Sequence, residues 1–184
     1  MIDLELNSLE DLKREGKSFY WASFFLPKSS KKKAGSLYSI CRYFDDIADE
    51  NNEDKTNYLK ESIEEIKNNK NNKVNIFLQQ NKINKSIFID LIDGLMFDQR
   101  KIRIQNKEEL IKYSYHVAGT VGLMMSKIIG VKNEKASQSA IDLGIGMQLT
   151  NIARDVYEDS KMQRIYLPAN WIPNISIKNL NNFG

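Results

Sequence analysis

The longest proline-free stretch of the chain runs from Pro27 to Pro168, and the third and last proline is Pro173. Because proline interrupts helix interiors and central strands alike, such a stretch favours long regular elements. Apolar residues in it recur at spacings of three and four, and no run alternates with period two and β-branched enrichment. The sequence therefore predicts an all-α protein with no substantial sheet.

Helices are expected over 8–26, 31–49, 58–67, 107–129 and 134–159, with one or two more over 76–97. The polar stretches 50–57 and 67–75 are expected to be loops. A length of 184 residues suits a single domain, 1–184, with one hydrophobic core. We expect Trp21, Phe24 and Phe25 to belong to that core.

The charges are nearly balanced, with 27 basic and 24 acidic residues and a net charge of +3. This balance gives no reason to expect nucleic acid as a partner. A single cysteine, Cys41, excludes an intrachain disulfide and favours a reducing, cytoplasmic setting. The acidic N-terminus does not resemble a secretory signal, and the apolar run 117–131 is too short to span a bilayer. Lys31–Lys33 is expected to be a solvated helix start, or else a peripheral contact with anionic membrane lipid.

The segment 37–50, LYSICRYFDDIADE, carries the first group of candidate site residues. Residues three and four apart share a helix face, which places four polar side chains on one stripe beside an apolar stripe. A solvated surface helix explains two aspartates at this spacing at least as well as a ligand site does. Because like charges at this spacing repel, the pair needs solvent or a cation. The polar stripe consists of Tyr38, Arg42, Asp45 and Asp49.

The segment 144–168 carries a second polar stripe, on a helix that is otherwise apolar on nearly every side. Such a helix is normally buried, and buried carboxylates are costly unless they meet cations. A solvated face therefore explains this segment less well than the first. The polar residues are Gln148, Asn151, Asp155 and Asp159, and the apolar residues around them include Ile145, Met147, Leu149, Ile152, Ala153 and Val156.

Two helices that each carry carboxylates four residues apart predict a shared site for a magnesium-bound diphosphate. Magnesium is commonly held by one or two carboxylates together with substrate phosphates. Arg42 and Arg154 are suited to bidentate contacts with phosphate oxygens. Because the only histidine is His116 and the only cysteine is Cys41, a zinc site is not expected. The sequence contains no GxxxxGK[ST] loop and no serine–histidine–acid set.

Four stretches, in this order along the chain, resemble motifs of the squalene/phytoene synthase family of head-to-head prenyl transferases. KSFYWASFFLP (17–27) is similar to the family's Ser-Phe opening, and LYSICRYFDDIAD (37–49) contains its Asp-x-x-x-Asp. YHVAGTVGLMM (115–125) resembles its small-residue helix, and QLTNIARDVYED with RIYLP (148–168) resembles its second aspartate motif. Family members often have Arg-Gly-Arg where this chain has Met162, Gln163 and Arg164, which makes Arg164 a weaker candidate for a phosphate contact.

The resemblance implies a role for each matching residue. The implied ligands of Mg²⁺, or of Mn²⁺ in its place, are Asp45, Asp49, Asn151, Asp155 and Asp159. The implied catalytic residues are Tyr38, Arg42, Asp45, Asp49, Asp155 and Asp159. The implied substrate-binding residues are Ser18, Phe19, Tyr38, Arg42, Val117, Val121, Gly122, Gln148, Asn151 and Arg154. The apolar lining for the prenyl tails would be completed by Gly119, Met125 and Gly144.

The resemblance also implies a fold and an activity. The fold is an isoprenoid-synthase-type helical bundle around a central apolar cavity, and this chain would correspond to its N-terminal portion, without the C-terminal helices. The preferred activity joins two geranylgeranyl diphosphates to phytoene, via prephytoene diphosphate. The alternative is squalene, presqualene diphosphate or dehydrosqualene from farnesyl diphosphate, with NADPH needed only for squalene. A non-catalytic assembly factor and a one-substrate terpene cyclase are further alternatives, and the oligomeric state is left open.

Overall fold

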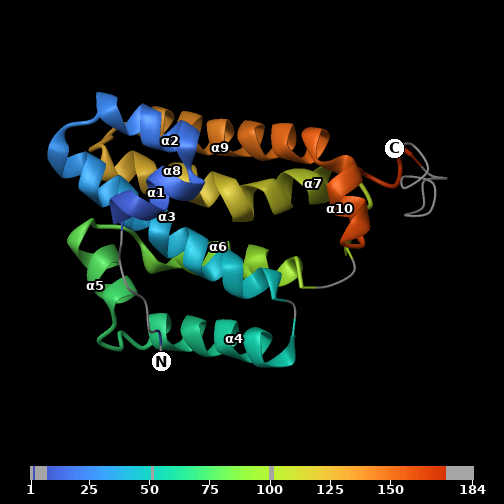
Figure 1. The fold of residues 1–184 in the computed structure, drawn as a ribbon, viewed down its shortest axis with the longest axis horizontal. Coiled ribbons are helices and arrows are strands. Elements are labelled where there is room, and N and C mark those ends of the chain that lie inside the picture. The colour runs from blue at the N-terminus through green and yellow to red at the C-terminus, as the bar shows by residue number, and fades with distance from the viewer. Residues whose placement is uncertain (1, 3–7, 51, 100–101, 173–184) are drawn as a thin grey trace.

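The computed structural model describes residues 2, 8–50, 52–99 and 102–172, which form a helical bundle with one pair of two-residue strands (Figure 1). The prediction of an all-α protein is confirmed. The elements are α1 (Ser8–Glu15), α2 (Lys17–Ala22), the 3₁₀ turn η1 (Ser23–Phe25), α3 (Lys28–Asp49), α4 (Glu53–Lys67), α5 (Lys73–Gln80), α6 (Lys85–Phe97), β1 (Ile102–Arg103), α7 (Lys107–Ser114), the π-helical segment η2 (Tyr115–Gly119), α8 (Thr120–Ile128), α9 (Glu134–Arg154), α10 (Val156–Lys161) and β2 (Arg164–Ile165).

Asparagine side chains begin many of these helices. The side chain at the N-cap of α4, α5, α6, α7 and α9 accepts a hydrogen bond from a backbone N–H two or three residues further on. Each such cap contributes about 1 kcal/mol to helix stability. Two of them correct the expected loops, because α4 already begins at Glu53 and α5 at Lys73. The capping residues are Asn52, Asn72, Asn84, Asn106 and Asn133.

Two of the expected helices are interrupted. The expected helix over 8–26 is α1, α2 and η1, with a break at Gly16, where a Cβ atom would lie 2.9 Å from the ring of Tyr38. Tyr38 can therefore pack against this junction only because residue 16 has no side chain. The expected helix over 134–159 is divided into α9 and α10 by Asp155, whose φ of −101° and ψ of 18° are not helical. Backbone hydrogen bonds still connect Asn151 to Asp155 and Asp155 to Asp159, at 2.9 Å and 2.8 Å, so the chain continues its turns through the break.

The helices pack in layers, with α4 and α9 on opposite sides of the bundle and α3, α6 and the α7–α8 run between them (Figure 1). The main core lies among α3, α4, α5, α6 and α8, where the fully buried rings of Phe44 and Phe88 meet edge to face at 5.4 Å. A smaller cluster joins β1, α7 and α9, and includes Tyr113, Ile152 and Tyr166. Val117, in η2, packs against both clusters and so connects them.

The burial of α9 differs from the expectation. Along this helix the buried residues are Gly144 and Ile152, whereas Leu143 is 67% exposed and Met147 is 41% exposed. The contact face is narrow because glycines let two backbones approach closely. A Cβ atom at Gly144 would lie 2.4 Å from the carbonyl oxygen of Ala118, and one at Gly122 would lie 2.2 Å from that of Ala140. The opposite, apolar face of α9 is left uncovered.

The expectation that Trp21, Phe24 and Phe25 belong to the core is wrong. Their side chains are 70%, 54% and 91% exposed, respectively. Figure 1 shows the reason, because α2 lies on the outside of the bundle and contributes no buried residue. In the part of the chain that the structure describes, no helix is long and apolar enough to cross a membrane.

Candidate active site

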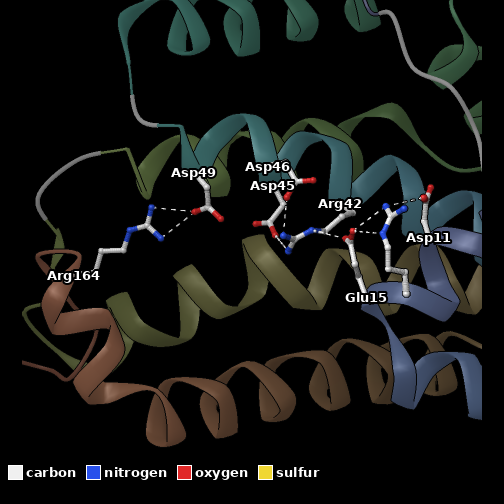
Figure 2. Close-up of polar contacts among 8 residues, drawn as sticks. Asp11, Glu15, Arg42, Asp45, Asp46, Asp49 and Arg164 are labelled. Carbon is white, nitrogen blue, oxygen red and sulfur yellow. Dashed lines mark hydrogen bonds and ion pairs between the residues drawn. The ribbon is translucent and has the colours of Figure 1, made fainter. Parts of the chain in front are cut away.

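Arg42, in the middle of α3, is held by three carboxylates (Figure 2). Its guanidinium nitrogens lie 2.9 Å from Asp45, 2.7 Å from Asp46 and 3.2 Å from Glu15 of α1. Each ion pair uses a different nitrogen, and the Nη1 atom donates a hydrogen bond to Asp45, so the guanidinium is oriented along the carboxylates. Arg42 therefore links α1 to the aspartate stripe of α3 and partly neutralises Asp45.

The two aspartates of the first motif lie in different environments. Burial, and then the neighbouring charge of Asp49, raises the pKa of Asp45 to about 6 even though Arg42 acts in the opposite direction. Asp49 has a side chain that is 51% exposed, and its Oδ1 accepts hydrogen bonds of 3.2 Å from two guanidinium nitrogens of Arg164. Asp45 and Asp49 thus repel each other, as their spacing predicts, and Arg164 from a distant part of the chain pairs with Asp49.

Arg164, which the sequence ranks below the other arginines, connects the two aspartate segments. Its side chain is only 12% exposed and reaches toward Asp49 (Figure 2). It follows a tight turn in which Gln163 has a φ of +61°, a left-handed conformation that favours glycine. Arg164 is the first residue of β2, and its pairing with Ile102 of β1 fixes the position of its backbone.

Asp159 shares a small pocket with Arg164. Burial, followed by the charge of Asp155, raises the pKa of Asp159 to about 6, and Arg164 opposes this shift. Arg164 thus contacts Asp49 directly and is close enough to Asp159 to favour its charged form. The pocket is lined by Ile152, Val156, Asp159, Arg164, Ile165, Tyr166 and Leu167.

Asp155 and Arg154 pair with each other. The Nε atom of Arg154 donates a 2.6 Å hydrogen bond to Oδ1 of Asp155, and its Nη2 atom donates one of 2.6 Å to Oδ2. This contact lowers the pKa of Asp155. The side chain of Arg154 is 67% exposed and that of Asp155 is 35% exposed. Both residues thus lie at the exposed junction of α9 and α10, and their expected metal and phosphate contacts stay predictions.

A buried network beside Arg164 was missed by the sequence reasoning. The hydroxyls of Tyr113 and Tyr166 donate hydrogen bonds of 2.8 Å and 2.7 Å to the carboxylate of Asp98. The two rings stack with their centroids 4.9 Å apart. Burial raises the pKa of Asp98 to about 6, although both hydroxyls and Arg164 favour the charged form. Of these three residues, only Tyr166 belongs to one of the motifs, RIYLP. Asp98 and Tyr113 lie outside the motifs, so the sequence did not indicate them.

The residues expected to bind substrate are distributed over three helices. Phe19 of α2 is half exposed and lies 6.4 Å from Tyr38 of α3, measured between ring centroids, while Ser18 is exposed. Val117, Val121 and Met125 are half-buried against the main core. Gln148 and Asn151 are half-buried on α9. Gly119, Gly122 and Gly144 lie where η2, α8 and α9 approach one another and permit close packing there, and their expected contact with the prenyl tails stays a prediction.

The donor set of this region has the chemistry that magnesium requires, since it consists of carboxylate and amide oxygens. Asp45 and Asp159 each have a pKa raised to about 6, in part by a neighbouring carboxylate, and a bound cation would relieve that repulsion. Among the described residues, no group of three or more Asp, Glu, His or Cys side chains lies close enough to hold a metal ion. The metal assignment of Asp45, Asp49, Asn151, Asp155 and Asp159 therefore stays a prediction.

Comparison with known proteins extends over nearly the whole chain. A 15-cis-phytoene synthase from Enterobacter agglomerans is 31% identical over 174 residues, covering 85% of this chain and 59% of the relative. A 15-cis-phytoene synthase from a Paracoccus species is 29% identical over 189 residues, covering 94% of this chain and 62% of the relative. The chain thus spans about three fifths of the length of these relatives.

Solved structures with the same fold include two enzymes named for related products. A dehydrosqualene synthase in complex with a ligand is 31% identical, with a TM-score of 0.82, over 94% of this chain and 64% of that one. The squalene synthase HpnC from Alicyclobacillus acidocaldarius, at 21% identity and a TM-score of 0.79, covers 95% of this chain and 72% of its own, and shows the fold alone. The family model described as squalene/phytoene synthase matches residues 12–179. The resemblance of the four motifs is therefore confirmed, and this chain belongs to the squalene/phytoene synthase family.

Proposed function

We propose that this protein condenses two prenyl diphosphates at their C1 ends in a magnesium-dependent reaction. The observation that carries the proposal is that Arg164 lies close to carboxylates from distant parts of the chain. Its guanidinium lies 3.2 Å from Asp49 of α3 and lines the same pocket as Asp159 of α10. Magnesium is commonly held by one or two carboxylates together with substrate phosphates, and a nearby guanidinium could contact the phosphate oxygens.

The carboxylates would hold the metal from two sides. Bound magnesium would act as a Lewis acid and template that neutralises the leaving diphosphate. In this proposal Asp45 and Asp49 would contribute from α3, and Asp155 and Asp159 from the α9–α10 junction, with Asn151 one turn earlier. Asp45 and Asp159 are the two whose ionised forms gain most from a nearby cation, because burial raises their pKa to about 6.

The cationic side chains would bind the diphosphate oxygens. Arg164 is well placed because it is nearly buried and already oriented by Asp49. Arg42 is oriented by Glu15, Asp45 and Asp46. A preorganised guanidinium loses little side-chain entropy on binding an anion, which favours tight and directional contacts.

An apolar wall would keep water from the reacting carbon atoms. Val117, Val121 and Met125 belong to η2 and α8, which pack between α3 and α9. Phe19 and Tyr38 supply aromatic surface on the opposite side, where α2 meets α3. Excluding water prevents capture of an allylic cation as an alcohol. The π-helical segment η2 fits this role, since such segments occur frequently at functional sites.

We prefer phytoene, made from two geranylgeranyl diphosphates via prephytoene diphosphate, as the product. This choice is supported by the two relatives that cover 85% and 94% of the chain, both of which are named 15-cis-phytoene synthase. The second candidate is a product of farnesyl diphosphate such as dehydrosqualene or squalene. It is supported by the dehydrosqualene synthase that is 31% identical with a TM-score of 0.82.

The test incubates the purified protein with geranylgeranyl or farnesyl diphosphate and Mg²⁺, with and without NADPH, and identifies the extracted hydrocarbons. Phytoene from the longer substrate is expected. Dehydrosqualene or squalene from the shorter one would favour the second candidate, and a cyclised product from one substrate would favour a terpene cyclase. Turnover that persists in EDTA would reject the metal dependence.

A binding measurement tests the site without requiring turnover. Titration with inorganic pyrophosphate and Mg²⁺ by calorimetry is expected to show binding that disappears when EDTA is added. Binding without turnover would favour a non-catalytic assembly factor, whereas the absence of any binding would reject the proposed site.

A further inference from the structure

The connection between α1 and α3 exposes aromatic side chains on the outside of the bundle. Phe25 is 91% exposed, Trp21 is 70% exposed and Phe24 is 54% exposed. The three are close in sequence, on α2 and η1, and the rings of Trp21 and Phe24 lie 5.8 Å apart. Exposing neighbouring large aromatic rings to water is unfavourable, so such a patch indicates an interaction surface.

The same connection is strongly cationic. No aspartate or glutamate occurs between Glu15 and Asp45, whereas five lysines occur between positions 17 and 33. Lys28, Lys31 and Lys32 are three and four residues apart at the start of α3, so they share one face of that helix. The chain as a whole has a net charge of only +3, so this basic segment is a local feature.

The aromatic and basic side chains form one surface. The ammonium group of Lys31 lies 3.6 Å from the centroid of the Phe24 ring and 5.4 Å from that of Tyr20. These cation–π contacts place a positive charge directly on the aromatic patch. We define the aromatic–lysine surface as Trp21, Phe24, Phe25, Lys28, Lys31 and Lys32.

We propose that the aromatic–lysine surface docks the protein on anionic phospholipid membranes, with Trp21 and Phe25 entering the headgroup region and the lysines meeting lipid phosphates. Tryptophan and phenylalanine are favoured at the membrane–water interface, where an apolar ring is partly buried. Lysines within a Debye length of an anionic bilayer are attracted to its negative surface potential. The combination matches a charged bilayer in both chemistry and sign.

A second copy of the chain fits this surface less well. Pairing two such surfaces face to face would bring their lysines together without any carboxylate from the same segment to neutralise them. A bilayer with anionic headgroups provides the opposite charge and the apolar phase at once.

The location of the surface has a consequence for the substrate, and this consequence alone rests on the proposed function. Phe19 lies on the same helix, α2, and its ring lies near that of Tyr38, with which it is proposed to form part of the apolar wall around the prenyl chain. Docking through α2 and η1 would therefore bring the site close to the bilayer that dissolves prenyl chains. Vesicle binding itself does not depend on catalysis, so the two proposals can fail separately.

The test measures partitioning of the protein onto sucrose-loaded vesicles by sedimentation. Binding to phosphatidylglycerol-containing vesicles is expected, with much weaker binding to pure phosphatidylcholine and a decrease with added salt. The W21A/F25A and K28E/K32E variants should each lower the partition coefficient by about tenfold or more. In a W171F background, the fluorescence of Trp21 should shift to the blue when vesicles are added, because its ring leaves water.

Matched controls distinguish binding through this surface from nonspecific adsorption of exposed apolar side chains and from the effect of net charge. L143A removes another exposed apolar side chain, on α9, and K60E/K73E makes the same charge change on α4 and α5. Both controls should bind within about twofold of the wild type. The proposal is overturned if the wild-type protein ignores anionic vesicles, or if the surface variants bind as it does. A dimer that is lost in W21A/F25A, without vesicle binding, would assign the surface to a second copy instead.

Discussion

The two aspartate segments differ in how their carboxylates are held. The first lies on a continuous helix of 22 residues whose apolar flank is buried, and Arg42 ties its aspartates to α1. The second is divided at Asp155, presents an uncovered apolar face at Leu143 and Met147, and pairs Asp155 with its own neighbour, Arg154. The same spacing of carboxylates therefore occurs in two different packing environments, and the partners of the carboxylates differ between them.

The largest expected effect is on turnover. Asp45→Asn and Asp155→Asn should each reduce the rate by roughly a thousandfold or more, because each removes a charge that the proposed metal site needs. The rate is measured with prenyl diphosphate and Mg²⁺, and circular dichroism should show unchanged helicity.

Asp46→Asn is the matched control for this comparison. Asp46 contacts Arg42 on the same helix but lies off the stripe, so its loss should reduce turnover by less than about tenfold. If Asp155→Asn behaved like this control while Asp45→Asn did not, the second segment would have no part in the metal site. Wild-type rates in both would reject the site.

The two faces of α9 predict opposite effects on stability. Gly144→Ala should lower the free energy of unfolding by about 3 kcal/mol, because its Cβ atom would lie 2.4 Å from the backbone oxygen of Ala118. Gly146→Ala should raise it by about 0.5–1 kcal/mol, since a Cβ atom there meets nothing within 4 Å and alanine favours the helix. Urea denaturation measures both, and equal effects would mean that α9 has no packed face.

The third comparison concerns the two arginines of the second segment. Arg164→Ala should weaken the binding of Mg²⁺–pyrophosphate by about tenfold or more, because it removes a buried, oriented guanidinium. Arg154→Ala should change the affinity by less than about threefold, since that side chain is 67% exposed and paired with Asp155. Calorimetry measures the two affinities. The reverse order would restore Arg154 as the phosphate contact.

The last comparison concerns the pH dependence of stability. Burial raises the pKa of Asp98 to about 6, so between about pH 4 and 6 the folded protein binds more protons than the unfolded chain. The contribution of Asp98 to the free energy of unfolding therefore falls as the pH rises through this window. Asp98→Asn should remove about 2 kcal/mol of this decrease, measured by urea denaturation at each pH. Asp45 and Asp159 add slopes of the same sign, so the difference from the wild type is the quantity to compare.

Much of the fold was accessible from local signals. The absence of proline and the apolar spacing predict the helices, and an asparagine begins many of them. Those caps were not recognised in the polar stretches that were expected to be loops, which is why α4 and α5 begin earlier than expected. The breaks at Gly16 and Asp155 were missed because neither interrupts the apolar periodicity.

The candidate site was only partly accessible for the same reason. Asp45 and Asp49 were found because a helix places them on one stripe with Arg42. The contact of Arg164 with Asp49 was not predicted because it depends on the turn at Gln163 and on the pairing of β2 with β1, neither of which is visible in local spacing.

The sequence alone determined the helical class, the two aspartate motifs and the family, because these depend on residue types at short, fixed spacings. The tertiary structure decided which charges meet. Asp98, Tyr113 and Tyr166 form one network, and Arg164 reaches Asp49, although the partners come from separate parts of the chain. It also decided that Trp21 and Phe25 face solvent. Contacts between distant segments depend on how helices pack and where they break, and side-chain periodicity contains no information about either.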